Sequence, residues 1–218
     1  MNDSRAEIFS RLNKASQLKQ HEVESSITSI NKRITEHRRG VLPAFNEDLL
    51  ERFIAKAEKV EATVKCISST SELSDAVYEY LSENNIAPNI AAAPSALLKN
   101  LEWKDEVSIE YRASLGEDLT TLTVAYAGVA ETGTLMLCSS KESPTSLNFL
   151  PDNNICVIQQ GEIFPYVEDV WDKLRKETDV MPRAVNFISG PSRTADVEQT
   201  IQLGAHGPRR LHIIIIKN

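Results

Sequence analysis

The sequence of 218 residues has few cysteines, no long apolar run and no common nucleotide-binding motif. Its three cysteines, Cys66, Cys138 and Cys156, lie far apart and show no C-x-x-C spacing. That pattern offers no disulfide framework, which indicates a reducing compartment. It also gives this chain alone no evident way to ligate an iron–sulfur cluster or a structural zinc. We therefore expect no metal and no cofactor in this chain.

Membrane spans and the two best-known phosphate-binding loops are also missing. The longest apolar run is residues 213–216, whereas crossing a bilayer takes roughly 20 residues. The first twelve residues lack the apolar stretch of a secretory signal. No G-x-G-x-x-G occurs, and the P-loop spacing of Gly128 and Gly133 is followed by Thr134 and Leu135, where a P-loop has Lys and Ser or Thr. We therefore expect a cytosolic chain without a membrane span and with neither a dinucleotide fingerprint nor a P-loop.

The charge is negative and uneven. The formal net charge is −7, which argues against nucleic acid as the main partner. Residues 1–45 hold eight Lys or Arg and five Asp or Glu, a net of +3, so the 16 basic and 26 acidic residues that follow carry −10. A basic arm on an acidic body suggests a contact within an assembly; a solvated helical extension explains the same charges.

Helical and strand patterns alternate along the body. A capping box at Ser4 and Glu7 predicts a first helix over about 4–18, and a weak helix running into a linker is expected over 20–43. The domain boundary is therefore placed between residues 43 and 44. Further helices are predicted from Asn46, from Ser69, and at 94–98, 166–176 and 194–202. Strands are predicted at 63–67, 89–92, 107–109, 121–129, 134–138, 155–159, 184–188 and 211–216. This alternation predicts an α/β fold with a mostly parallel sheet flanked by helices, residues 211–216 being a central strand.

Three strand-end loops concentrate small and polar residues, and we name them by their sequences. They are the AETGT turn (residues 128–134), the GPSRT loop (189–196) and the GAHGP loop (204–208). In an open α/β sheet, ligands bind beyond the carboxyl ends of the strands, where such loops gather. The ligand-binding residues predicted there are Thr132, Gly133, Thr134, Gly190, Pro191, Ser192, Arg193, Thr194, Gly204 and Gly207.

The GPSRT loop suggests an anion site. Ser192 or Thr194 could cap the predicted helix, whose free N–H groups, with Arg193 beside them, would suit a carboxylate or phosphate. The alternative is that both hydroxyls only cap the helix while Arg193 pairs with Asp196 or Glu198.

Two further side chains are candidates for catalysis. Glu131 follows an apolar strand and precedes a glycine, so it would be a partly buried carboxylate able to act as nucleophile or base. Alternatively, it accepts backbone N–H bonds from the turn. His206, between Gly204 and Gly207, could be a general acid or base or a hydrogen-bond donor. A structural histidine bonded to backbone is equally consistent with the sequence.

The runs AETGTLML, ISGPSRTADVE and LGAHGPRRLHIIII resemble the signature segments of the lactate-utilization protein C family, the LUD domain. The resemblance is strong over about 120–218 and looser over 44–119. It implies the fold shared by ribose-5-phosphate isomerase, glucosamine-6-phosphate deaminase and class I CoA transferases. Residues 131–133 are also similar to the Ser-Glu-Asn-Gly loop that carries the nucleophilic glutamate of those transferases, although Ala130 and Thr132 replace its Ser and Asn.

The resemblance further implies a role beside two iron–sulfur subunits in the oxidation of L-lactate to pyruvate in the bacterial cytosol. The iron–sulfur clusters are then expected only in the partners, and this chain would be a non-redox subunit that binds a small carboxylate or phosphorylated ligand or docks the partners. Two alternatives stay open. One is a stand-alone enzyme of acyl-CoA or sugar-phosphate type that uses Glu131, and the other is a scaffold without a ligand.

Overall fold

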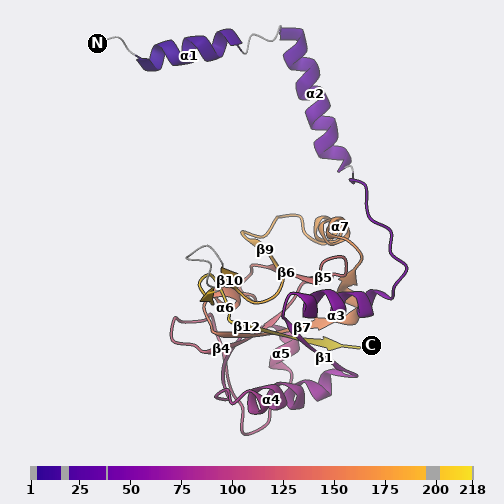
Figure 1. Ribbon diagram of the computed structural model, residues 1–218, viewed down its shortest axis with the longest axis vertical. Coiled ribbons are helices and arrows are strands. Elements are labelled where there is room, and N and C mark those ends of the chain that lie inside the picture. The colour runs from indigo at the N-terminus through magenta and orange to yellow at the C-terminus, as the bar shows by residue number, and fades with distance from the viewer. Residues whose placement is uncertain (1–3, 16–19, 38, 195–201, 218) are drawn as a thin grey trace. The chain divides into compact units, whose positions relative to one another are not determined.

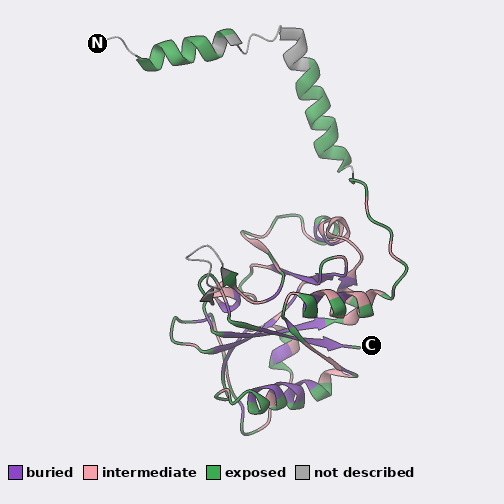
Figure 2. Ribbon diagram, in the orientation of Figure 1, coloured by how far each residue is buried: buried purple, intermediate pink, exposed green. Residues whose placement is uncertain are grey.

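The computed structural model describes residues 4–15, 20–37, 39–194 and 202–217 (Figure 1). The chain divides into two compact units, residues 1–44 and 45–218. Unit 1 contains the helices α1 (Ser4–Ala15) and α2 (Gln20–Glu36). Every helical side chain of this unit that the structure describes is exposed (Figure 2). The exposed side chains include two apolar triplets, Ile8, Phe9 and Leu12 on α1 and Ile27, Ile30 and Ile34 on α2.

Unit 2 is built on a six-stranded sheet in which every pair of neighbours is parallel. Its order is β1-β12-β7-β4-β2-β3. The strands are β1 (Thr63–Ile67), β12 (Arg210–Ile216), β7 (Asn153–Gln159), β4 (Thr120–Val124), β2 (Asn89–Ala92) and β3 (Ser108–Tyr111). The predicted fold class is confirmed, and so is the interior position of the 211–216 run.

Helices cover both faces of this sheet. Alternate residues of β12 point to opposite faces: Ile213 and Ile215 pack with Phe53 of α3 (Leu49–Lys59), whereas Ile214 belongs to the cluster that contains α4 (Leu73–Glu83). Figure 1 shows α3 and α4 on opposite sides of the sheet. Each fully buried isoleucine side chain contributes roughly 1.5–3 kcal/mol of transfer free energy. Both faces of the apolar run are therefore covered, as expected for a strand in the interior of the sheet.

Short elements complete this layer. They are the 3-10 turns η1 (Thr70–Glu72) and η2 (Gln160–Glu162) and the helices α5 (Ala96–Lys99) and α6 (Ser146–Phe149).

The N-terminal cap of α3 differs from the expected one. The side chain of Asp48, rather than that of Asn46, accepts the N–H groups of Leu50 and Glu51 at 2.9 and 3.1 Å.

A second sheet of four strands, which the sequence patterns did not predict, has the order β8-β5-β6-β9. Its strands are β8 (Ile163–Phe164), β5 (Ala127–Val129), β6 (Thr134–Cys138) and β9 (Val185–Ile188). Leu135 of β6 faces the α3 layer, and Met136 packs with Val170 of α7 (Val167–Glu177). The single strand predicted over 121–129 is wrong. Backbone pairing changes from Val157 of the first sheet at Ala125 to Met136 of the second at Tyr126, which splits it into β4 and β5.

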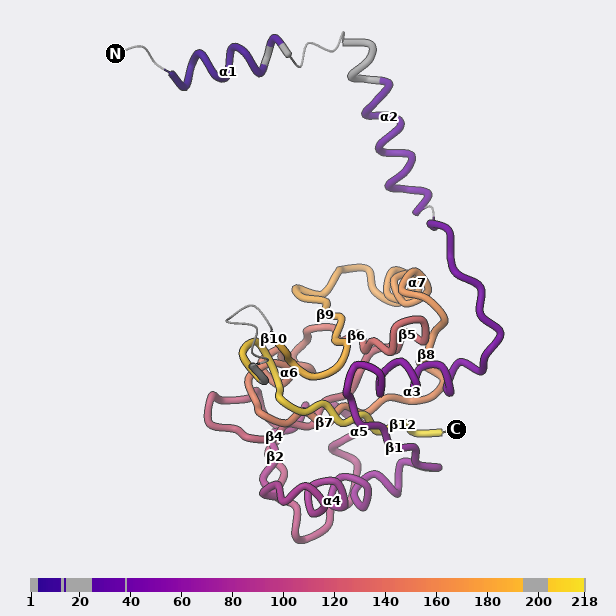
Figure 3. Tube along the Cα trace, in the orientation of Figure 1, coloured from indigo at the N-terminus to yellow at the C-terminus, as the bar shows by residue number. Residues whose placement is uncertain are grey.

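The helix predicted at 194–202 is also wrong at both of its ends. Arg193–Thr194 forms β10 and Gln202–Leu203 forms β11, and the two strands pair antiparallel. The predicted residues between them lie outside the described residues. Because residue 194 is strand, the argument that a helix N-terminus binds an anion there does not hold. Figure 3 shows β10 beside the loops that precede β12.

Candidate functional site

The AETGT turn joins β5 to β6 and packs directly on α3. Gly133 donates its N–H to the carbonyl of Val129 at 2.9 Å and has a φ of +65°. A Cβ at this position would overlap the backbone nitrogen of Ala57. Only glycine combines this backbone conformation with so close an approach, so the turn and the helix hold one another in place.

The GPSRT loop packs on Val60, the residue that follows α3. Gly190 has a φ of +74°, and a Cβ there would overlap the carbonyl oxygen of Val60. A row of hydroxyl groups connects this loop to the AETGT turn. The Thr132 and Thr134 Oγ1 atoms are 2.7 Å apart, and the Thr134 Oγ1 lies 2.6 Å from the Oγ of Ser189. Two of the three predicted loops are therefore joined by side-chain hydrogen bonds.

Ser192 joins the GPSRT loop to the GAHGP loop. Its N–H donates to the carbonyl of Pro208 at 2.8 Å, and its carbonyl accepts the N–H of Gly204 at 3.1 Å. Its hydroxyl accepts the N–H of His206 at 3.2 Å. The expected helix cap at Ser192 is thus replaced by a bond to the neighbouring loop. The structure brings all three predicted loops together, and we call this group the three-loop cluster.

The cluster lies at the amino edge of the parallel sheet rather than at the expected carboxyl edge. The GAHGP loop precedes β12, and the N–H groups of Arg209 and Arg210 donate to the carbonyl of Asp152, just before β7. Val60, against which Gly190 packs, precedes β1. The expectation failed because it treated the GAHGP loop as following a strand of the main sheet.

Two arginines bring positive charge to the three-loop cluster. The Arg193 guanidinium lies 3.2 Å from the carboxylate of Glu61, and the Arg209 Nε lies 3.5 Å from that of Asp152. Arg193 and Glu61 are exposed by 42% and 60%, so solvent screens this pair and an anion in solution can reach the guanidinium. The alternatives Asp196 and Glu198 lie outside the described residues.

Glu131 and His206, the two catalytic candidates, are not in contact with each other among the residues that the structure describes. Glu131 is half-buried, and its N–H donates to the carbonyl of Pro165 at 3.0 Å. Within the described part of the chain no hydrogen bond or ion pair reaches its carboxylate, so the alternative of a turn carboxylate that accepts backbone N–H groups finds no partner there. His206 is exposed, and it is its backbone N–H that bonds to Ser192.

His212 is a buried histidine to which sequence reasoning gave no role. Its Nδ1 lies 2.7 Å from the hydroxyl of Thr63, and its ring stacks on that of Tyr80 with centroids 4.0 Å apart. Burial, with the charge of Lys65, lowers the pKa of His212 from 6.5 to about 4. The imidazole is therefore neutral at pH 7, and it lies inside the core rather than at the three-loop cluster.

Two cavities also escaped the sequence analysis. One, of about 390 Å³, lies beside β2 and β3, where the guanidinium of Arg112 donates to Glu110 and, through two nitrogens, to Asp118. Arg112 holds the pKa of Asp118 down to about 2. The other, of about 340 Å³, lies at the carboxyl ends of β2 and β4 and is lined by Ser95, Tyr126 and Cys138 among others. The only sequence feature that could have pointed to this second cavity is the run of small residues that follows β2, Ala93-Pro94-Ser95.

Comparison with known proteins decides the family. The family model for the LUD domain matches residues 50–216. The chain belongs to the LUD domain family. Unit 1 lies outside the match, whereas both sheets and all three predicted loops lie within it.

Individual relatives agree with this assignment. The LUD domain chain is 40% identical over 92 residues to Uncharacterized protein NMB1437 of Neisseria meningitidis, an alignment that covers 42% of this chain and 40% of that protein. It is 29% identical to a Lactate utilization protein C of Anoxybacillus flavithermus, over 52% of this chain and 48% of that protein. The chain thus spans about half the length of these curated relatives.

A solved structure shares the fold. The crystal structure of a DUF162 family protein from Deinococcus radiodurans aligns with a TM-score of 0.59 and 24% identity, over 80% of this chain and 99% of that one. In the described part of this LUD domain protein, no helix is long and apolar enough to span a membrane. No group of three His, Cys, Asp or Glu side chains among the described residues is placed to hold a metal ion.

Proposed function

We propose that this LUD domain protein is a non-redox subunit of a cytosolic system that oxidises L-lactate to pyruvate and that its partners carry iron–sulfur clusters. The observation that carries the proposal is the family match over residues 50–216, together with relatives named Lactate utilization protein C. The cysteines support the division of labour. Cys66, Cys138 and Cys156 lie on three different strands, β1, β6 and β7, whereas a cluster needs thiolates that converge.

The three-loop cluster is the proposed ligand site. Lactate and pyruvate are small carboxylates, and an arginine guanidinium can bind a carboxylate through two parallel N–H bonds. Arg193 is an exposed residue of the GPSRT loop, and its present partner Glu61 is a carboxylate that a ligand could replace. The close contact of Gly190 with Val60 fixes the start of the loop against the end of α3, and an oriented binding site needs such support.

A gene deletion with complementation tests the role. We expect the deletion strain to lose growth on L-lactate and to keep growth on pyruvate, provided that no other lactate dehydrogenase is present. The wild-type gene should restore growth. A tagged copy should also recover cysteine-rich iron–sulfur proteins from lactate-grown cells. Normal growth of the deletion strain on L-lactate would contradict the proposal.

An enzyme that uses Glu131 is the second candidate, favoured by one observation. The half-buried Glu131 carboxylate has no hydrogen-bond or ion-pair partner among the described residues, which leaves it available as a nucleophile or base. Turnover of acyl-CoA or sugar-phosphate substrates by the isolated wild-type chain, abolished in Glu131→Gln, would establish this function. A chain that shows neither turnover, ligand binding nor partners would be the ligand-free scaffold.

A further inference from the structure

The cleft of about 340 Å³ at the carboxyl edge of the parallel sheet has the position of a ligand site. From β2 the sheet continues outward to β3, whereas from β4 it continues in the opposite direction through β7 to β12. The reversal of strand order lies between β2 and β4. Ala93 and Ser95 follow the first of these strands, and Val124 and Ala125 end the second. Open α/β sheets bind ligands at such a point.

The lining is mainly apolar and carries hydroxyl groups. The apolar residues of the lining come from the ends of β2 and β4, from α7 and from the segment before β9, namely Ala93, Val124, Ala125, Leu174 and Pro182. The hydroxyl oxygens of Ser95, Ser139 and Ser140 each accept a backbone N–H, from Leu98, Ala184 and Glu142. A serine hydroxyl that accepts such a bond still has its own proton to donate. The cleft therefore offers serine hydroxyl donors within a mainly apolar lining.

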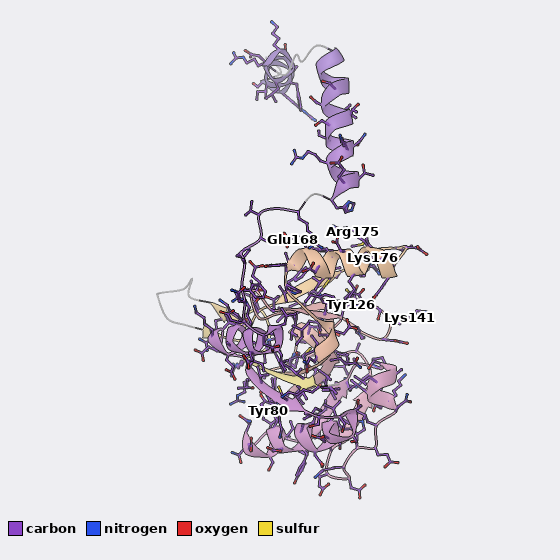
Figure 4. The ribbon with its side chains drawn as sticks, turned by 90° about the vertical axis from the view of Figure 1, so that its right-hand side faces the viewer. Tyr80, Tyr126, Lys141, Glu168, Arg175 and Lys176 are labelled. Atoms are coloured by element: carbon purple, nitrogen blue, oxygen red, sulfur yellow. The ribbon has the colours of Figure 1, made fainter. Side chains whose placement is uncertain are left out.

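The charge of the lining disfavours anions. Among the residues that line the cleft, Glu142 is charged, and no Lys or Arg is present. Lys173 lies over the ring of the lining residue Tyr126, but its ammonium is paired with Glu162 and Glu177. Lys141, labelled in Figure 4 with Tyr126, is exposed and is not part of the lining. A carboxylate or phosphate would meet a like charge and no counter-ion there.

We propose that this cleft binds an uncharged ring compound that carries carbonyl groups. The ring would lie against the apolar residues of the lining, and its carbonyl oxygens would accept the serine hydroxyl protons. A nicotinamide, a quinone and a flavin ring share this chemistry. The proposal does not depend on the lactate role, because the three-loop cluster lies at the opposite edge of the sheet.

Calorimetric titration of the full chain with nicotinamide, duroquinone and riboflavin tests the proposal and separates the three sources. Two of these probes have anionic twins, nicotinate for nicotinamide and flavin mononucleotide for riboflavin. We expect at least one neutral probe to bind, and its anionic twin, where one exists, to bind at least tenfold more weakly. Absence of binding by all three at millimolar concentration, or equal binding of a twin, would overturn the proposal.

Two variants locate the binding. Ser95→Ala with Ser139→Ala should weaken it at least tenfold, whereas Ser82→Ala, on an exposed residue of α4, should leave it unchanged. If the loss of the bond to Ala184 unfolds the double variant, Val124→Phe, which fills the cleft, replaces it. Unchanged affinity in the folded variant would refute the assignment.

Cys138 gives a second readout because it lines the cleft. Burial raises the pKa of its thiol to about 11, so alkylation is slow and is best followed at pH 9. In a Cys66→Ser background the remaining cysteine, Cys156, is fully buried. The bound probe should slow alkylation of Cys138 at least fivefold, and an unchanged rate at saturating probe would count against the cleft as its site.

Discussion

Replacement of His212 by phenylalanine should remove an acid-sensitive element from the core. The neutral imidazole is buried between Thr63 and Tyr80, with Lys65 near enough to lower its pKa further. In the unfolded chain the imidazole binds a proton near pH 6.5, whereas in the folded chain it does so only near pH 4. Above pH 6.5 both states are neutral, and the residue adds no pH dependence.

As the pH falls from 6.5 toward 4, the unfolded state takes up a proton that the folded state does not. The free energy of unfolding should then decrease by up to about 1.4 kcal/mol per pH unit. A pKa that falls from 6.5 to about 4 makes the complete loss roughly 3 kcal/mol below pH 4. A phenylalanine at position 212 can stack on Tyr80 but cannot bind a proton, and the exposed hydroxyl of Thr63 can bond to water.

Urea unfolding at several pH values between 5 and 8 measures this effect as a difference of slopes. The wild type should lose about 2 kcal/mol more than His212→Phe between pH 7 and pH 5. The comparison of slopes removes the contribution of the other histidines, which both proteins share, and any constant cost of the larger ring. Parallel pH profiles for the two proteins would refute the reasoning.

Three further predictions concern the three-loop cluster. Gly133→Ala should lower the free energy of unfolding by at least about 2 kcal/mol, because alanine would have to adopt a strained positive φ and its Cβ would overlap α3. The control Gly116→Ala, whose Cβ would meet open space, should be near neutral in the same urea titration. Glu131→Gln should leave the melting temperature nearly unchanged and abolish lactate growth if the carboxylate acts chemically, whereas retained growth would exclude that role. Arg193→Lys should weaken lactate binding about tenfold by calorimetry with little change in stability, since lysine keeps the charge but loses the two-pronged contact; undiminished binding would exclude Arg193 from the site.

The main sheet was predictable because its strands are marked by local composition. The run at 211–216 is apolar at every position except His212, and such a run has to be covered on both faces. The second sheet was not predictable in this way. Residues 121–129 form one continuous strand-like stretch, and its division at Ala125 and Tyr126 depends on strands far away in sequence that pair with each half.

The candidate site was predicted in its parts but not in its location. The three loops do meet, because the hydroxyls of Thr134 and Ser192 reach across to neighbouring loops. The sequence could not show whether the loops lie at the amino or the carboxyl edge of the sheet, because that depends on which strands of the main sheet they precede or follow. The hairpin of β10 and β11 has the same origin. Its strands of two residues each are too short to leave a periodic pattern.

Strand β6 has a geometric consequence for any ligand pair that this protein binds. Thr134 at its start is bonded to Ser189 in the three-loop cluster, and Cys138 at its end lines the carboxyl-edge cleft. Four steps along a strand span about 13 Å. The two sites are therefore separate, while the same five residues connect both. Spectroscopic labels at the two ends of β6 would lie a fixed distance apart, and the distance from each label to a bound molecule would show which end that molecule occupies.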